Sequence, residues 1–186
     1  MSNSLYTSFL DQLETQNNRG NDGWSNGATK EPTWMISIPS ITNSTVDGFK
    51  KHAYIHAYRF KLSRGIEANA SRTIRPDGGV VGEDLKVVMP LSAVDASLDN
   101  IFAENREIPK IEICRLSLIK KKKEIVESYI FQNCFITAML PVDNVLSIAF
   151  RYGSYERKSV YYNQQGVKKG QKSSQHDLTK STSKAK

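Results

Sequence analysis

The stretch LKVVMPLSAVDASLDNIFAENREIPKIEICRLSL, residues 85–118, carries the pattern that decides the fold of this 186-residue chain. Its first five residues are apolar apart from one lysine, which favours a strand. A helix is expected after the proline that follows, because four apolar side chains recur at spacings that place them on one helical face: Val94, Leu98, Ile101 and Phe102. Ser92, or the competing Asp95, fits the N-terminal cap of this helix, and Asn105 fits its left-handed end.

The second half of the same stretch begins a long strand, predicted over residues 108–119. Its apolar positions change phase between Ile113 and Cys114, so we expect either a β-bulge or burial of both faces. The lysine run 120–123 predicts the next turn. Further strands are expected beyond it, at residues 124–131, 134–140, 145–152 and 156–162. The short turns between these strands imply antiparallel pairing.

Upstream of residue 85 the dominant period is also two. Residues 34–38, WMISI, predict a first short strand, and the alternating residues 54–62 predict a half-buried second strand. Residues 64–84 are polar and contain a turn signal, PDGG at 76–79, so we expect a long loop. The order of elements predicts a mainly β fold: an antiparallel β-barrel or tight sandwich with one flanking α-helix.

The chain carries a net charge of +7, and the excess lies at its C-terminal end. Residues 157–186 hold eight basic residues and one acid, whereas residues 1–156 hold 18 of each sign. The segment 164–186 has almost no large apolar side chain, so we predict a basic, disordered tail. Residues 1–32 predict a weakly structured extension with a short amphipathic helix, which leaves residues 33–163 as the folded domain.

Side chains that could carry chemistry are few and scattered. His52 and His56 share one face of the predicted strand but would lie about 13 Å apart there, too far for one metal ion to bridge. Cys114 and Cys134 lie in apolar strand segments, which predicts buried structural thiols and not nucleophiles. The glycine-rich segment 75–82 lacks the spacing of a phosphate-binding loop. We therefore expect no catalytic, metal or cofactor site.

Two basic features keep nucleic-acid binding open as an alternative. The lysine run 120–123 could contact phosphates, although such a run more often caps a solvated hairpin and discourages edge-to-edge pairing. Tyr161 and Tyr162, near the basic tail, could stack on bases. The balanced charge of the folded part argues against specific nucleic-acid binding.

Taken together, residues 85–118 resemble the centre of Hcp, the hemolysin-coregulated tail-tube protein of type VI secretion systems. In that family a strand leads into a comparable helix, and an Ile-Pro-like step then leads into a long strand. The matching residues are Asp95, Ala96, Ser97 and Leu98 at the helix, and Ile108, Pro109 and Lys110 at the strand. MISIPSITNST and DGFKKHAYIHAYRFKLSRG upstream, and YIFQNCFITAML and VLSIAFRYGSYERK downstream, extend the resemblance over residues 34–162.

The resemblance implies a β-barrel subunit that closes into a hexameric ring and stacks into the inner tube of a contractile, phage-tail-like apparatus. Its partners would be copies of itself, the surrounding sheath proteins, a VgrG-type spike and effectors in the lumen. No catalysis is required. The sequence has neither a secretory signal pattern nor an apolar run as long as a membrane span, which agrees with cytoplasmic assembly followed by export through the apparatus.

By position, the loop 64–84 resembles an extended loop of that family, which reaches a neighbouring subunit or ring. A loop of this length in a compact domain is usually functional or disordered. We expect its charged side chains to form the contact between subunits: Arg64, Glu67, Arg72, Arg75, Asp77, Glu83 and Asp84. We also expect the loop to become ordered on assembly.

The two extensions and the lysine run exceed a minimal Hcp subunit. The chain could therefore be the main tube subunit, a specialised paralogue or a relative from another contractile apparatus. A second hypothesis is a non-catalytic adaptor or binding module whose basic tail engages nucleic acid or an anionic partner. A third, a toxin-like enzyme carried on the same fold, is weaker because neither extension is long enough for a catalytic domain.

Overall fold

Segments in which every second residue is apolar or β-branched form β-strands between turns. Neighbouring strands satisfy each other's main-chain N–H and C=O groups, and most of this chain is paired in this way. The computed structural model describes residues 34–42, 48–68, 74–178 and 182–185. By its internal contacts the chain divides into residues 1–31 and residues 32–186, and the fold described here is that of the second unit. The predicted amphipathic helix of the N-terminal extension lies outside the described residues.

Within the described residues the chain forms twelve strands, one 3₁₀ turn and one α-helix. In chain order these are β1 (Trp34–Ser37), β2 (Ala53–Tyr54), β3 (Ala57–Arg59), β4 (Leu62–Ala68), β5 (Ile74–Gly82), β6 (Leu85–Pro90), η1 (Leu91–Ala93), α2 (Ser97–Ala103), β7 (Ile108–Ile119), β8 (Lys122–Val142), β9 (Val145–Arg151), β10 (Ser154–Tyr162), β11 (Lys168–Asp177) and β12 (Thr182–Ala185).

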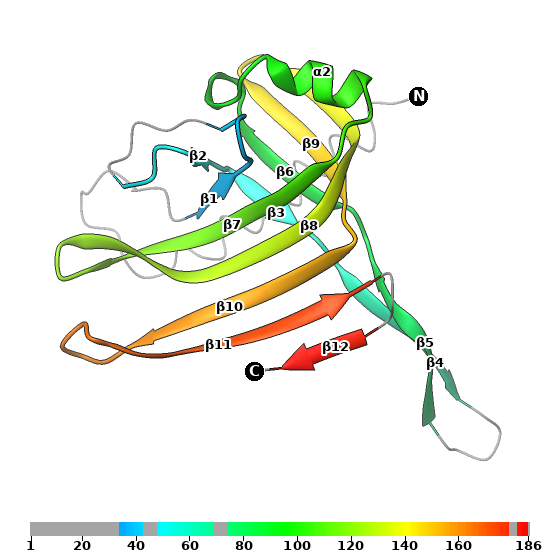
Figure 1. Ribbon diagram of the computed structural model, residues 1–186, viewed down its shortest axis with the longest axis vertical. Coiled ribbons are helices and arrows are strands. Elements are labelled where there is room, and N and C mark those ends of the chain that lie inside the picture. Colours follow the sequence, from blue (N-terminus) through cyan, green and yellow to red (C-terminus); the bar gives the residue numbers. More distant parts are fainter. Residues whose placement is uncertain (1–33, 43–47, 69–73, 179–181, 186) are drawn as a thin grey trace. The chain divides into compact units, whose positions relative to one another are not determined.

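The strands form a barrel from two sheets that share β8 (Figure 1). The first half of β8 lies between β7 and β10, and its second half pairs with β9. The order continues from β9 to β6 and β3, and from β7 to β1 and β2. The barrel closes where β2 runs into β3, because the Ile55 N–H donates to the carbonyl of Trp34 on β1 (3.3 Å) and the His56 N–H to that of Val88 on β6 (2.8 Å). The predicted antiparallel, mainly β fold with a flanking helix is confirmed.

The bend that lets β8 serve both sheets lies at Asn133, whose φ of 54° is in the left-handed region that asparagine tolerates. The neighbouring chain turns at the same level, because β9 ends and β10 begins on either side of residues 152–153. Two separate strands are predicted from the sequence here, at 124–131 and 134–140. They are one strand because pairing continues through the bend, where Ile108 of β7 lies opposite Cys134.

The core fills the barrel with apolar side chains from the strands of both sheets. On β9 every second residue points into the barrel, since Leu146, Ile148 and Phe150 are fully buried. The phase change in β7 comes from burial of both faces. Ile113 packs into the barrel core, whereas Cys114 packs with Met35 and Leu116 in a second cluster on the other face. The register with β8 also shifts, just beyond this point, between Arg115 and Leu116.

The predicted helix is shorter than its apolar pattern suggests. Val94 forms an isolated bridge with Thr42, which holds the backbone extended after η1 and delays α2 to Ser97. Of the two predicted cap residues, Ser92 lies within η1, and Asp95 lies at the start of the helix, one position before its N-cap residue Ala96. The Asp95 carboxylate accepts the Ser97 N–H at 2.8 Å. Leu98 and Ile101 are buried as expected.

Two further predictions concern the last turn of this helix, and only the second of them is confirmed. Phe102, predicted on the buried face, is 41% exposed because a helix of two turns covers the barrel with only one narrow stripe. Asn105 is confirmed as the left-handed residue after the helix, with a φ of 47°.

The prediction of a single strand over residues 54–62 is wrong. The chain divides there into β2, β3 and the start of β4, because it changes sheet partner from β1 to β6 at the barrel closure. The inward face also changes there. Ile55 is buried in the barrel core and His56 is exposed, whereas beyond the break Tyr58, Phe60 and Leu62 pack against the core.

The disorder predicted for residues 164–186 does not hold for residues 168–177, which form β11. This strand pairs with β10 from Tyr162↔Lys168 to Ser154↔Asp177, and β12 pairs with β11 in turn. An unpaired edge of β10 supplies the main-chain hydrogen bonds, so β11 needs no apolar face of its own. One strong side-chain contact adds to the pairing, because His176 stacks on Tyr155 with ring centroids 5.0 Å apart.

The segment 64–84 is a β-hairpin and not an irregular loop. β4 and β5 pair with each other as a separate two-stranded sheet, which extends away from the barrel in Figure 1. The PDGG segment at 76–79 lies within β5, so the turn predicted there is wrong. The register shifts between Arg64 and Ile66, which is where the glycine at position 65 stands.

Candidate assembly surfaces

The hairpin β4–β5 carries most of the predicted interface residues. Glu67 and Arg75 lie directly opposite each other in its register, and Arg64 lies opposite Val80. Asp77 follows the Ile66↔Pro76 pair, at the register shift. Arg72 lies outside the described residues. The backbone therefore places charged positions of both signs along a two-stranded element that pairs with no other described strand.

The other two predicted interface residues, Glu83 and Asp84, fasten the hairpin to the barrel. Glu83 forms an ion pair with Lys61 at 3.0 Å, and its N–H donates to the carbonyl oxygen of Lys61. Asp84 accepts hydrogen bonds from Arg151 and from the hydroxyl of Thr137 (2.8 Å). Both carboxylates are thus engaged within the subunit.

The position of Asp84 between β5 and β6 affects its ionisation. Burial disfavours the carboxylate, but the hydrogen bonds from Arg151 and Thr137 outweigh burial and hold the pKa of Asp84 below its ordinary value. The charged form of Asp84 therefore stabilises the join between hairpin and barrel.

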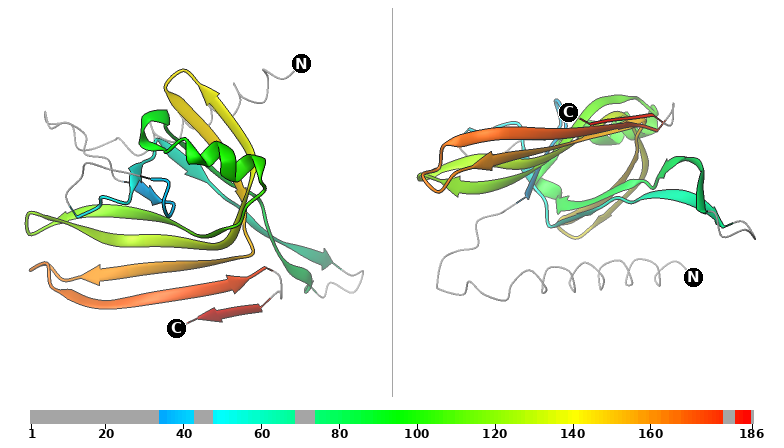
Figure 2. Two further views of the ribbon diagram at one scale, coloured as in Figure 1. Left: turned by 45° about the horizontal axis from the view of Figure 1, so that its top comes forward. Right: turned by 90° about the horizontal axis from the view of Figure 1, so that it is seen from below.

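A second surface forms where two turns lie against each other at one end of the larger sheet. Figure 2 shows the β7–β8 turn beside the β10–β11 turn. Gly166 of the second turn packs closely on the first, since a β-carbon there would lie 2.9 Å from Ile119 Cγ2 and 3.0 Å from Lys120 Cγ. The Asn163 side chain closes its turn by accepting the Val167 N–H at 2.8 Å. Two regions that are separate in sequence thus become one surface.

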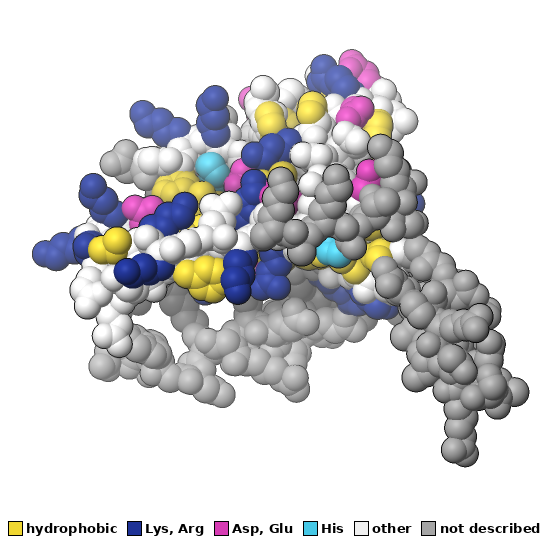
Figure 3. Space-filling model, turned by 60° about the horizontal axis from the view of Figure 1, so that its bottom comes forward, with side chains coloured by type: hydrophobic (Ala, Val, Ile, Leu, Met, Phe, Trp, Pro, Cys, Tyr) yellow, Lys and Arg dark blue, Asp and Glu magenta, His cyan; other side chains and the backbone are white. Residues whose placement is uncertain are grey.

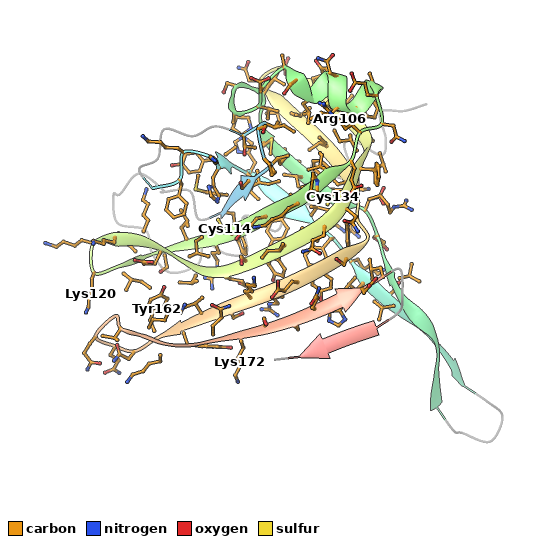
Figure 4. All side chains as sticks on the ribbon, in the orientation of Figure 1. Arg106, Cys114, Lys120, Cys134, Tyr162 and Lys172 are labelled. Atoms are coloured by element: carbon orange, nitrogen blue, oxygen red, sulfur yellow. The ribbon has the colours of Figure 1, made fainter. Side chains whose placement is uncertain are left out.

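This surface is strongly basic, and we call it the lysine end. Residues 118–123 and 160–176 contribute seven lysines and no acid to it, and Glu124, opposite Ser117, is the first acid of β8 beyond the turn. The lysines are Lys120, Lys121, Lys122, Lys123, Lys168, Lys169 and Lys172. Figure 4 shows Lys120 and Tyr162 at this end of the sheet. Lys172 lies over the ring of the half-exposed Tyr161, 5.8 Å from its centroid.

Sequence reasoning identified the lysine run and the basic tail but missed that they meet. The predicted turn at 120–123 is confirmed, because Lys120 and Lys121 have φ values of 50° and 65°, as a two-residue hairpin turn requires. The signal that could have been used is that both segments contain no acid. Their meeting depends on β10 lying beside β8, which no local pattern records.

Between the lysine end and the barrel core, Glu127 organises a charged cluster. Arg157 donates two hydrogen bonds to it (2.6 and 3.0 Å), the Tyr129 hydroxyl donates a third (3.0 Å), and Arg115 lies 3.5 Å away. The side chain of Glu127 is only 13% exposed. A carboxylate with this many donors is fully engaged, so the cluster stabilises the extended sheet.

The remaining predicted chemistry residues lie apart. His56 is exposed, whereas His52 packs edge-on against Phe49, and burial lowers the pKa of His52. The described residues contain no group of three or more potential metal ligands. Cys114 and Cys134 are fully buried, as predicted, and burial raises the pKa of each thiol to about 12. They are not cross-strand neighbours, since Cys114 lies opposite Ser128 and Cys134 opposite Ile108.

Three solved structures of type VI secretion proteins share this fold. A protein described as a type six secretion system protein is 18% identical, with a TM-score of 0.67, over 83% of this chain and 100% of its own. Hcp1 from Salmonella typhimurium is 14% identical, with a TM-score of 0.63, over 82% of this chain and 98% of its own. A type VI secretion system effector from Yersinia pestis is 13% identical, with a TM-score of 0.56, over 78% and 99%.

These matches establish the fold of the chain. No protein-family model and no curated protein matches the sequence. The described unit has the Hcp fold, and the match covers nearly the whole length of each solved protein, so the resemblance found in residues 85–118 is confirmed for the architecture. Among the described residues, no helix has the length and apolar character to cross a membrane.

Proposed function

We propose that this protein is a non-catalytic structural subunit whose copies form hexameric rings, and that the rings stack into the inner tube of a type VI secretion apparatus. The observation that carries the proposal is the coverage of the fold, which spans all of a type six secretion system protein and 98% of Hcp1. A whole subunit is matched, and not a shared fragment. The barrel interior supports a structural role, because large apolar side chains such as Phe131 and Phe150 fill it.

The hairpin β4–β5 is the proposed arm between subunits. An isolated two-stranded hairpin is only marginally stable in water, and this one pairs with no other described strand. A neighbouring subunit would supply the missing surface. In this proposal Arg64, Glu67, Arg72, Arg75 and Asp77 make the contact, while Glu83 and Asp84 hold the base of the arm. The arm becomes ordered when subunits assemble.

The remaining partners follow from the role of a tube. Sheath proteins would surround it, a VgrG-type spike would cap it, and effectors would travel in its lumen. The subunit would assemble in the cytoplasm and leave the cell through the apparatus itself. These assignments rest on the likeness in fold to Hcp1 and to a type VI secretion system effector.

Native mass spectrometry combined with negative-stain imaging tests the proposal. Purified protein at increasing concentration is expected to form six-copy rings and, at higher concentration, stacked rings. Limited proteolysis in the same samples is expected to cut the 64–84 hairpin in monomers and to spare it in rings. A protein that remains monomeric at high concentration, with equal cleavage at all concentrations, would contradict both statements.

A second candidate function has one observation in its favour. The lysine end gathers seven lysines without an acid beside the half-exposed Tyr161, which suits an adaptor that binds a polyanion such as nucleic acid. Deleting residues 163–186 would remove β11, so substitution of the lysines is the cleaner test. Salt-sensitive binding of an oligonucleotide, lost in Lys168→Glu/Lys169→Glu, with no ring formation by the wild type, would favour this function.

A further inference from the structure

A third surface lies at the end of the barrel that carries α2, and we call it the helix end. It consists of residues 91–107 and the β8–β9 turn, which meet where the Leu91 N–H donates to the carbonyl oxygen of Asn144 at 2.8 Å. Five exposed acids and one base stand on it: Asp95, Asp99, Glu104, Glu107, Asp143 and Arg106. Its formal charge is therefore 1 − 5 = −4.

The backbone of the helix end is held firmly in place. The Thr42 hydroxyl donates to the carbonyl oxygen of Lys51 (2.8 Å) and accepts the Ile38 N–H (2.9 Å), and Thr42 itself bridges to Val94. The Asp95 N–H donates to the carbonyl oxygen of Ile41 at 3.0 Å. The acids are thus presented on a rigid platform, which lowers the entropic cost of a contact with a partner.

The lysine end and the helix end lie at opposite ends of β7. This strand starts at Ile108, directly after the helix end, and stops at Ile119, directly before the lysine turn. Eleven residue steps of extended chain span about 36 Å. Figure 4 shows the same separation, with Arg106 beside α2 and Lys120 at the far end of the sheet.

Exposed apolar side chains gather at the same two ends. The described residues include seven large hydrophobic side chains that are 40–64% exposed. Leu118, Tyr161 and Val167 belong to the lysine end, Leu91 and Phe102 belong to the helix end, and Leu140 lies in β8 close to the β8–β9 turn. The seventh is Val81 of the hairpin. In Figure 3 hydrophobic side chains stand between the lysines and arginines at the left end of the molecule.

We propose that the lysine end of one subunit docks on the helix end of the next subunit in the stack. The inference rests on the proposed function and deepens it by naming the axial contact. Two different patches on one subunit, opposite in charge and each containing exposed apolar side chains, are what a head-to-tail contact requires. Because they lie at opposite ends of β7, each contact adds the next subunit along the direction of that strand, which is the geometry of stacking.

The charges and the apolar side chains contribute in different ways. Opposite charges speed the encounter and select the head-to-tail orientation, since two lysine ends or two helix ends repel each other. Salt screens such contacts over about 8 Å at physiological ionic strength, so stacking is expected to weaken as salt rises. Burial of Tyr161, Leu118 and Phe102 supplies attraction that salt does not screen.

The test uses two charge-reversal variants of the full chain. Lys168→Glu/Lys169→Glu lowers the formal charge of the lysine end from +7 to 7 − 4 = +3. Glu104→Lys/Glu107→Lys raises that of the helix end from −4 to −4 + 4 = 0, at the C-terminus of α2, where cations suit the helix dipole. Lys50→Glu/Lys51→Glu reverses two exposed lysines outside both ends and is the matched control. Circular dichroism and thermal unfolding verify that all three remain folded.

Each end variant alone is expected to form rings that stack more weakly than the wild type, whereas the control stacks like the wild type. A mixture of the two end variants is expected to recover pairs that contain one ring of each, because the unaltered lysine end of one fits the unaltered helix end of the other. Native mass spectrometry distinguishes the two variants by mass. Even without rings, 1:1 association of the two end variants at low salt that is stronger than the self-association of either alone supports the contact.

Several results would overturn the inference, and they can be distinguished from results that would overturn the proposed function. Unchanged stacking of both end variants, or no recovery in the mixture, rules out this contact while leaving the tube proposal intact. Failure of the wild type to form rings rules out the tube proposal, and the low-salt association then decides the contact. Oligonucleotide binding that is lost in Lys168→Glu/Lys169→Glu while stacking persists would assign the lysine end to nucleic acid.

Discussion

Gly166 is the residue at which two distant parts of the chain meet. It has a φ of 68°, in the left-handed region that glycine occupies without cost, and it leaves no room for a β-carbon against Ile119 and Lys120. The lysine end therefore depends on one residue that carries no charge. A side chain at this position would separate the two turns.

We expect Gly166→Ala to lower the free energy of unfolding by about 1–2 kcal/mol, from the left-handed backbone alone. For a unit of this size that corresponds to about 2–4 °C in Tm per kcal/mol, measured by thermal unfolding. Gly170→Ala is the matched control, because no atom lies within 4 Å of a β-carbon there. Equal Tm values for the two variants would show that the turns do not pack as described.

Asp84 supplies a pH-dependent contribution to stability. Its folded-state pKa is depressed, because the hydrogen bonds from Arg151 and Thr137 outweigh the effect of burial. The stabilisation is therefore complete above the unfolded-state pKa, about 3.9, and is lost as the pH falls through the lower folded-state pKa.

We expect Asp84→Asn to cost on the order of 1 kcal/mol at pH 7, a modest value because Arg151 is largely exposed to solvent. Denaturant titrations at a series of pH values should show the difference from wild type narrowing below pH 4. Glu83→Gln, which removes an exposed ion pair with Lys61, serves as the comparison and should cost less. A constant difference for Asp84→Asn from pH 7 to pH 2 would contradict this assignment.

At the scale of elements, the hairpin β4–β5 is separable from the barrel. Its pairing begins at Leu62↔Gly82 and Ser63↔Val81, next to the anchored residues Glu83 and Asp84. Beyond these pairs it shares no register with another described strand. Its removal should therefore leave the barrel core unaffected.

We expect replacement of residues 64–80 by Asn-Gly, which joins Ser63 to Val81 as a two-residue turn, to give a folded subunit that does not form rings. Circular dichroism and Tm should remain near the wild-type values, while native mass spectrometry should show monomers. Rings of normal size from this variant would exclude the hairpin as the arm between subunits.

For the whole molecule, assembly couples stability to concentration. A contact that exists only between folded subunits stabilises them by mass action, so the apparent Tm rises with protein concentration. We expect this rise in low salt, and a smaller one in high salt if the charged ends contribute. A Tm that is constant over a hundredfold range of concentration would mean that the subunit does not associate under these conditions.

Local sequence determined the elements that repeat a simple pattern. The alternating residues of β9, the lysine turn with its two left-handed residues, and Asp95 at the start of the helix follow from side-chain period and turn chemistry alone. The resemblance of residues 85–118 to Hcp then led to the correct architecture. These features were predictable because each is decided by residues a few positions apart.

Tertiary structure alone decided which strand edges meet. β11 has no apolar pattern and exists because β10 offers an unpaired edge, β8 remains one strand because its neighbours bend with it, and α2 starts late because Val94 bridges to Thr42. The two charged ends likewise arise from residues far apart in the chain. Such pairings depend on main-chain geometry that every residue type shares, so side-chain patterns do not record them.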